Sequence, residues 1–145
     1  MGLICNCGVI VNAVSEDNNV RFAGVQGTVN GDLRYMADVC DNNLPASFLT
    51  LNFTDESGGM VNRSFNFVAD TITSVVCRRE GMNCVVTVTG TGTVGGNTFP
   101  FEAVFRDQVD TANFDNVQSF VITGFFNQAG AAPVPQGSIV AVGCE

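Results

Sequence analysis

The segment from residue 85 to residue 107 alternates apolar and polar side chains, and it constrains the fold more than any other part of the chain. In its first half, apolar or small residues alternate with threonines, and in its second half, phenylalanine and alanine occupy every second position. Strict alternation is typical of half-buried β-strands. Gly95 and Gly96 lie between the halves and provide the positive φ angles that a tight hairpin turn needs. The segment therefore predicts a β-hairpin.

The two predicted strands have one threonine-rich face and one apolar face. A turn at Gly95 and Gly96 places four pairs of inward residues opposite one another: Val86 and Phe105, Val88 and Ala103, Gly90 and Phe101, Gly92 and Phe99. Phenylalanine rings are expected to cover the backbone at the strand glycines. Because the apolar face must be buried, the hairpin has to pack on a second sheet.

The rest of the chain supports an all-β fold. Alternating segments recur every 8–12 residues or so between turn-forming residues, and no helical periodicity of useful length is present. A chain of 145 residues suggests one domain, which can build a core without a metal or cofactor. We predict an antiparallel β-sandwich of jelly-roll or immunoglobulin-like type with about nine strands. Residues 15–145 form this domain, and residues 1–14 precede it as an extended arm.

Composition excludes several classes of function. The net charge is −8, and the chain contains no histidine and no lysine, so neither a nucleic-acid surface nor attraction to anionic lipid is expected. Without these residues, nucleophilic systems based on histidine and Schiff-base chemistry are unavailable. No apolar run is long enough for a membrane span. We therefore expect a protein that is not an enzyme and needs no cofactor.

Six cysteines dominate the candidate sites, and their connectivity stays open. Cys77 and Cys84 flank a short loop between two strands, which favours a disulfide that closes this hairpin within the domain. The other four are Cys5, Cys7, Cys40 and Cys144. They could form two bridges within the chain, link neighbouring subunits, or bind zinc, although the CxxC spacing of zinc knuckles is missing.

A second candidate site is an acidic loop. Asp107, Asp110 and Asp115 could bind Ca²⁺ together with loop carbonyl groups. Their spacing does not match the alternating ligands of an EF-hand loop, so a solvated acidic loop is the preferred interpretation and no metal is predicted.

The N-terminal arm is apolar around its two cysteines. Leu3, Ile4, Val9, Ile10 and Val11 could add as a strand to an open sheet of a neighbouring subunit. A contact of this head-to-tail kind does not close on itself, so it builds filaments.

Two resemblances carry further expectations. The motif order of residues 71–142, with TITSV, the hairpin GTGTVGGN, SFVITGFF and QGSIVAV, resembles a bacterial extracellular β-sandwich module whose hairpin turn is usually GTGTVNG. That resemblance implies a surface location. The layout of a short arm with Cys5 and Cys7 before a single β-domain resembles the subunits of bacterial endospore appendages. That likeness implies an arm that is disulfide-linked to neighbouring subunits.

The leading hypothesis is a structural subunit at the spore surface, at the cell surface or outside the cell. It would bind copies of itself into a filament through strand addition and disulfides between subunits. The alternative is a monomeric secreted module that binds a carbohydrate or protein ligand, with all cysteines paired internally.

Overall fold

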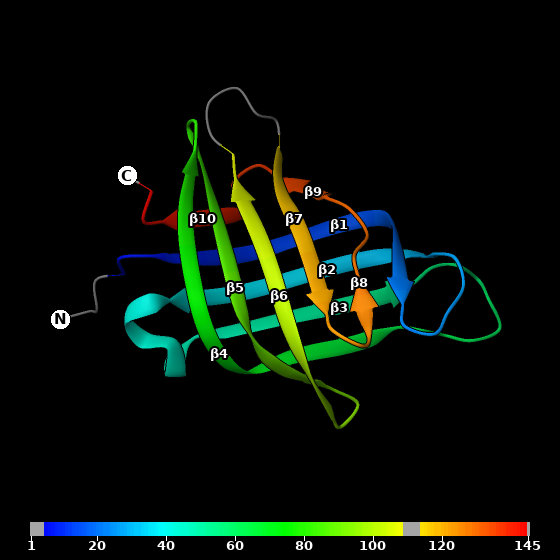
Figure 1. The fold of residues 1–145 in the computed structure, drawn as a ribbon. Coiled ribbons are helices and arrows are strands. Elements are labelled where there is room, and N and C mark those ends of the chain that lie inside the picture. Colours follow the sequence, from blue (N-terminus) through cyan, green and yellow to red (C-terminus); the bar gives the residue numbers. More distant parts are fainter. Residues whose placement is uncertain (1–4, 109–113, 145) are drawn as a thin grey trace.

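The computed structural model describes residues 5–108 and 114–144, which are almost entirely β-structure (Figure 1). The elements of this part of the chain follow in the order β1 (Gly8–Phe22), β2 (Val29–Cys40), the 3-10 helix η1 (Asp41–Ala46), β3 (Phe48–Asp55), β4 (Phe65–Glu80), β5 (Asn83–Val94), β6 (Asn97–Asp107), β7 (Phe114–Ile122), β8 (Phe126–Asn127), β9 (Ala132–Pro135) and β10 (Ile139–Val142).

Eight strands close into an antiparallel barrel. Strands β1 to β8 lie side by side in chain order, and the short strand β8 pairs both with β7 and with β1. Outside this ring, β9 pairs with β7 and β10 pairs with β1. The predicted open β-sandwich is therefore wrong, although the chain is all-β. An open sandwich and a flattened barrel bury the same alternate residues, so alternation alone cannot distinguish them.

The barrel is flattened into two layers whose strands cross, with β1, β2 and β3 running behind β5, β6 and β7 in Figure 1. Strand β4 belongs to both layers. Its register with β5 shifts between Ala69 and Thr71 and again between Ile72 and Ser74. Each shift marks a bulge, and bulges bend and twist a strand, so β4 turns the corner between the layers at this point.

The central hairpin has the register that the sequence predicts. Strands β5 and β6 pair Val86 with Phe105 and Gly92 with Phe99, and all four predicted pairs are confirmed. Gly95 and Gly96 form the turn with φ angles of 56° and 86°. The ring that lies closest to Gly92 belongs to Phe67 of β4, and it leaves no room for a β-carbon there.

The segment predicted to be an arm lies largely inside the protein's own barrel. Residues 8–14 form the first half of β1, between β10 on one side and β2 on the other. Val9 and Val11 are 1% and 2% exposed, whereas Ile10 points outward. Residues 8–14 therefore belong to the domain, and its boundary does not fall at residue 14. Leu3 and Ile4 lie outside the described residues.

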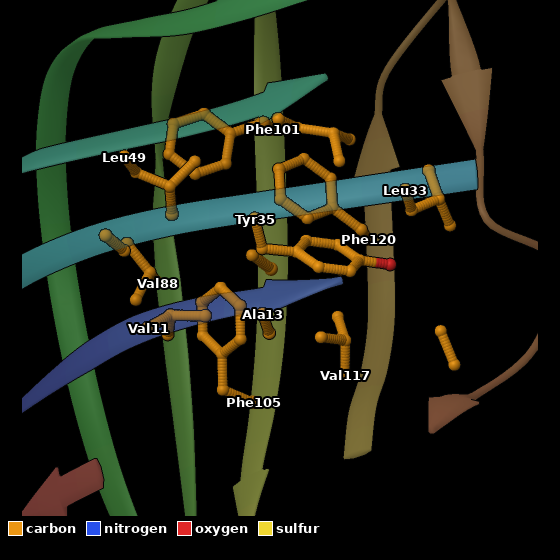
Figure 2. Packing of buried hydrophobic residues seen from close by; sticks show 14 of the residues in the cluster. Val11, Ala13, Leu33, Tyr35, Leu49, Val88, Phe101, Phe105, Val117 and Phe120 are labelled. Carbon is orange, nitrogen blue, oxygen red and sulfur yellow. The ribbon is translucent and has the colours of Figure 1, made fainter. Parts of the chain in front are cut away.

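Aromatic and aliphatic side chains together fill the barrel interior (Figure 2). Phe101 and Phe120, from the layer that contains β6 and β7, stack with ring centroids 6.2 Å apart. Tyr35 reaches this pair from β2, with its ring centroid 6.1 Å from that of Phe120. Both the Tyr35 and Phe120 side chains are at most 1% exposed. The core is therefore packed with side chains contributed by both layers.

One polar cluster interrupts this core. The Tyr35 hydroxyl donates to Oε1 of Gln128 at 2.5 Å, and Nε2 of Gln128 donates to the carbonyl oxygens of Val117 at 2.9 Å and Gly130 at 2.7 Å. Gln128 is 3% exposed and directly follows β8. Burial raises the pKa of Tyr35 well above its ordinary value. The hydrogen bonds of Gln128 thus hold the segment after β8, the strand that closes the barrel, against the barrel interior.

Candidate functional site

The six cysteines form three disulfides within the chain. Cys5 bonds to Cys40, Cys7 to Cys77 and Cys84 to Cys144. The predicted bond between Cys77 and Cys84 does not form, because alternate residues of β4 face the opposite layer and Cys77 meets Cys7 there. The four cysteines considered for links between subunits or for zinc are all used in these bonds.

Three internal disulfides are consistent with an oxidising environment, since such bonds persist mainly outside the reducing cytosol. Among the described residues, no helix has both the length and the apolar character needed to cross a membrane.

Two of the aspartates considered for calcium, Asp107 and Asp115, accept hydrogen bonds from backbone N–H groups. Asp115 is fully buried and accepts hydrogen bonds from the backbone N–H groups of Gln108 (2.9 Å), Gly137 (3.0 Å) and Ile139 (3.1 Å). Asp107 accepts from the N–H of Ala141 at 2.9 Å. The two carboxylates therefore hold the segment that leads into β10.

The environment of Asp107 also alters its acidity. Partial burial raises the pKa of Asp107, the N–H of Ala141 lowers it, and the nearby charge of Asp115 raises it further. Asp110 lies outside the described residues, so the three-aspartate arrangement is described only in part.

The hollows on the surface are small. One of about 300 Å³ lies between η1 and the bend of β4, and is lined by Leu44, Ser47 and Asp70 among others. Another of about 310 Å³ lies at the closing strand, next to Arg21, Phe22 and Phe125. Both are at the lower end of the volumes usual for small-molecule sites.

The largest group of exposed apolar side chains lies on the solvent side of the layer formed by β10, β1, β2, β3 and the first part of β4. We call it the outer apolar face. Its six apolar members are between 39% and 51% exposed: Ile10, Val14, Met36, Phe48, Val68 and Val140.

Strand register makes this face continuous. Ile10 lies opposite Val140 on one side and Asp38 on the other, and Asp38 lies opposite Phe48. The next row runs from Asn12 through Met36 and Thr50 to Val68. Residues directly opposite and diagonal in adjacent strands are within side-chain reach, so these apolar groups form one surface.

Two opposite charges lie on the outer apolar face. Arg34 and Asp38 flank Met36 on the same side of β2, and all three side chains are exposed. Neither charge forms an ion pair with another described residue; the ion pairs in this part of the chain join Glu80 to Arg78 and to Arg106. Each charged group is flanked across the strands by apolar side chains, Arg34 by Val14 and Asp38 by Ile10 and Phe48.

The sequence prediction missed this face. Its signal was present as apolar residues at positions that alternation assigns to the solvent side, such as Met36 between Arg34 and Asp38. Ile10 was assigned to strand addition as part of the arm, together with Val9 and Val11, and the structure separates it from them by pointing it outward.

Comparisons of this chain with protein-family models, curated proteins and solved structures find no match. The two resemblances noted from the sequence therefore stay predictions.

Proposed function

We propose that the protein is an extracellular structural subunit that associates with copies of itself through the outer apolar face. The observation that carries this proposal is the exposure of six large apolar side chains on one sheet face, in a domain whose interior is already filled. Large exposed apolar patches generally mark interaction surfaces.

A structural role also suits the chemistry of the chain. It has no histidine or lysine, and its partly or fully buried carboxylates at Asp107 and Asp115 accept hydrogen bonds from backbone N–H groups. Three disulfides within a chain of 145 residues favour durability outside the cell.

The proposed association differs from strand addition. Val9 and Val11 are buried in the protein's own barrel, and each cysteine has a partner in its own chain. The contact is therefore non-covalent and joins sheet faces. A reducing agent is not expected to dissociate the assembly unless it also unfolds the domain.

Light scattering coupled to size-exclusion chromatography, over a range of protein concentrations, tests the proposal. The wild-type protein is expected to form dimers or larger species as concentration rises. Ile10→Thr combined with Met36→Thr should keep it monomeric, because both changes remove exposed apolar groups, and threonine is β-branched and suits a strand. Val76→Thr is the matched control, since Val76 is 56% exposed on the other layer. A wild-type protein that stays monomeric at millimolar concentration would refute the proposal.

A second candidate function is the binding of a small ligand at the closing strand. The hollow of about 310 Å³ there is lined by Arg21, Phe22 and Phe125 among others. An arginine beside apolar residues in a hollow suits a carbohydrate ligand with an acidic group, because a guanidinium group binds a carboxylate. NMR titration with uronic-acid oligosaccharides, repeated on Phe125→Ala, tests it: shifts confined to residues 21–23 and 121–127 support this function.

A further inference from the structure

We propose that the outer apolar face forms a two-fold symmetric dimer in which Arg34 of each copy lies over Asp38 of the other. This inference rests on the proposed function, and it specifies the partner as a second copy of this chain, with a defined orientation. The symmetry axis lies between the two faces and runs across the strands, along the row Asn12–Met36–Thr50–Val68.

The spacing of the charges is the first argument. Arg34 and Asp38 are four residues apart on β2, with Met36 midway, so they are roughly 13 Å apart along the strand. At that separation they cannot pair with each other within one copy. Neither is ion-paired to another described residue, so both charges are available to a partner.

The charges also select the orientation. A sheet can meet its own copy face to face through a two-fold axis that runs either along the strands or across them. An axis along β2 places Arg34 over the second copy's Arg34 and Asp38 over its Asp38, so like charges oppose. An axis across β2 at Met36 reverses the strand direction, and each Arg34 then meets an Asp38. Like charges that face each other weaken binding, which disfavours an axis along β2 and favours the axis across it at Met36.

Four of the six apolar residues of the face meet apolar partners under the same operation, whereas Phe48 lies over Asn52 of the other copy. On β1, Asn12 lies on the axis, so Ile10 of one copy lies over Val14 of the other. Met36 lies over the second copy's Met36, and Val68 lies over its Val68. Sheets that pack face to face are about 10 Å apart with their strands rotated by roughly 30°. The arginine side chain is long and flexible, so Arg34 can still reach Asp38 of the other copy when the strands are rotated by this angle.

Net charge and size limit the affinity. Each copy carries a net charge of −8, and this long-range repulsion is largely screened beyond about 8 Å at physiological salt. Five strands at their usual spacing, and three rows of outward residues, give a face of about 500 Å². Stable interfaces bury about 800 Å² per partner, so we expect a dimer with a Kd in the micromolar range or weaker.

Charge reversal tests the orientation. Arg34→Glu gives a copy with two negative groups at these positions, and Asp38→Arg gives a copy with two positive groups. Each variant alone should dimerise at least about tenfold more weakly than wild type, because like charges then face each other. An equimolar mixture should form a heterodimer with both pairs restored, and the double variant should dimerise like wild type.

Matched controls are Arg79→Glu, which changes charge at an exposed position near the end of β4, and Glu102→Arg, on the solvent side of β6. Sedimentation equilibrium of all variants, with circular dichroism to verify folding, gives the dissociation constants. If the single reversals dimerise like wild type, or the mixture fails to form a heterodimer, the two-fold orientation is overturned. In that case the proposed function still stands if Ile10→Thr with Met36→Thr dissociates the assembly. A wild-type monomer at every concentration overturns both.

Discussion

The polar cluster of Tyr35 and Gln128 contributes to the free energy of unfolding, and substitutions measure by how much. The variants are Tyr35→Phe, Gln128→Met and the two changes together. Tyr35→Phe removes the hydroxyl that donates to Oε1 of Gln128, and it leaves that buried oxygen without a donor. The lost hydrogen bond and the desolvated acceptor together cost about 2–3 kcal/mol of the free energy of unfolding.

Gln128→Met has a larger expected effect. It removes three side-chain hydrogen bonds and leaves the carbonyl oxygens of Val117 and Gly130, and the hydroxyl of Tyr35, without their partner. We expect a loss of about 3–5 kcal/mol. In the double variant, the Tyr35 hydroxyl and its acceptor are absent together. Its loss should therefore be smaller than the sum of the single losses by about 1–2 kcal/mol.

Urea unfolding followed by circular dichroism under non-reducing conditions gives the three free energies. Losses that add within about 0.5 kcal/mol would refute the coupling. The protein offers an independent readout, because Tyr35 is its only tyrosine and it contains no tryptophan. Tyrosinate absorbance should show no ionisation near the ordinary pKa of 10.0 while the protein is folded. Titration at that value in the native state would mean that the hydroxyl is not buried as described.

Three further predictions concern packing, covalent links and pH. Gly92→Ala should lower the free energy of unfolding by about 1–3 kcal/mol, because its methyl group meets the ring of Phe67; chemical denaturation measures this, and a neutral effect would contradict the packing. Cys7→Ser with Cys77→Ser opens a link with a sequence separation of 70 and should cost up to about 4 kcal/mol in the same assay; a loss below about 1 kcal/mol would argue against the pairing. Asp107→Asn should gain stability over wild type as pH rises from 3 to 7. The folded state raises the pKa of Asp107, so the ionised carboxyl group disfavours folding. This effect is present when the pH is above the unfolded-state pKa near 3.8, and it is absent below that pH. After allowance for solvent screening the gain is at most about 1 kcal/mol, and denaturation at both pH values should show it only at the higher one.

Local patterns predicted the strands better than their closure. The hairpin of β5 and β6 could be predicted to the residue, because alternation and two turn glycines specify its register. Closure depends on β8, which has only two residues. Apolar and polar residues alternate from residue 117 to residue 126, which predicts one strand. The chain instead turns at Gly124, where φ is 86°, and β8 then pairs with β1. Two residues are too few to carry a periodic signal.

The cysteine pairing was beyond sequence reasoning for a different reason. Proximity along the chain favours a bond between Cys77 and Cys84, but both side chains face the opposite layer, where Cys7 and Cys144 arrive from the two ends of the chain. Which residues meet across the barrel depends on how β4 bends, and its two bulges leave no clear mark in the sequence. The outer apolar face was missed for another reason: its apolar residues are visible in the alternation, but the face exists only once five strands lie side by side.

The disulfides also determine how the domain would respond to tension. A load applied between Cys5 and Cys144 can pass from Cys7 to Cys77, along the chain to Cys84, and across to Cys144. This covalent route contains few residues and stretches to roughly 40 Å, whereas the same chain without the bonds would extend to roughly 470 Å. Residues 8–76 and 85–143 are outside the route, so among the barrel strands only the end of β4 and the start of β5, within residues 77–84, would carry the pulling force until a disulfide is reduced. A load that enters at Cys5 and Cys144 would therefore be borne by two disulfides and a single hairpin, while the rest of the barrel keeps its shape.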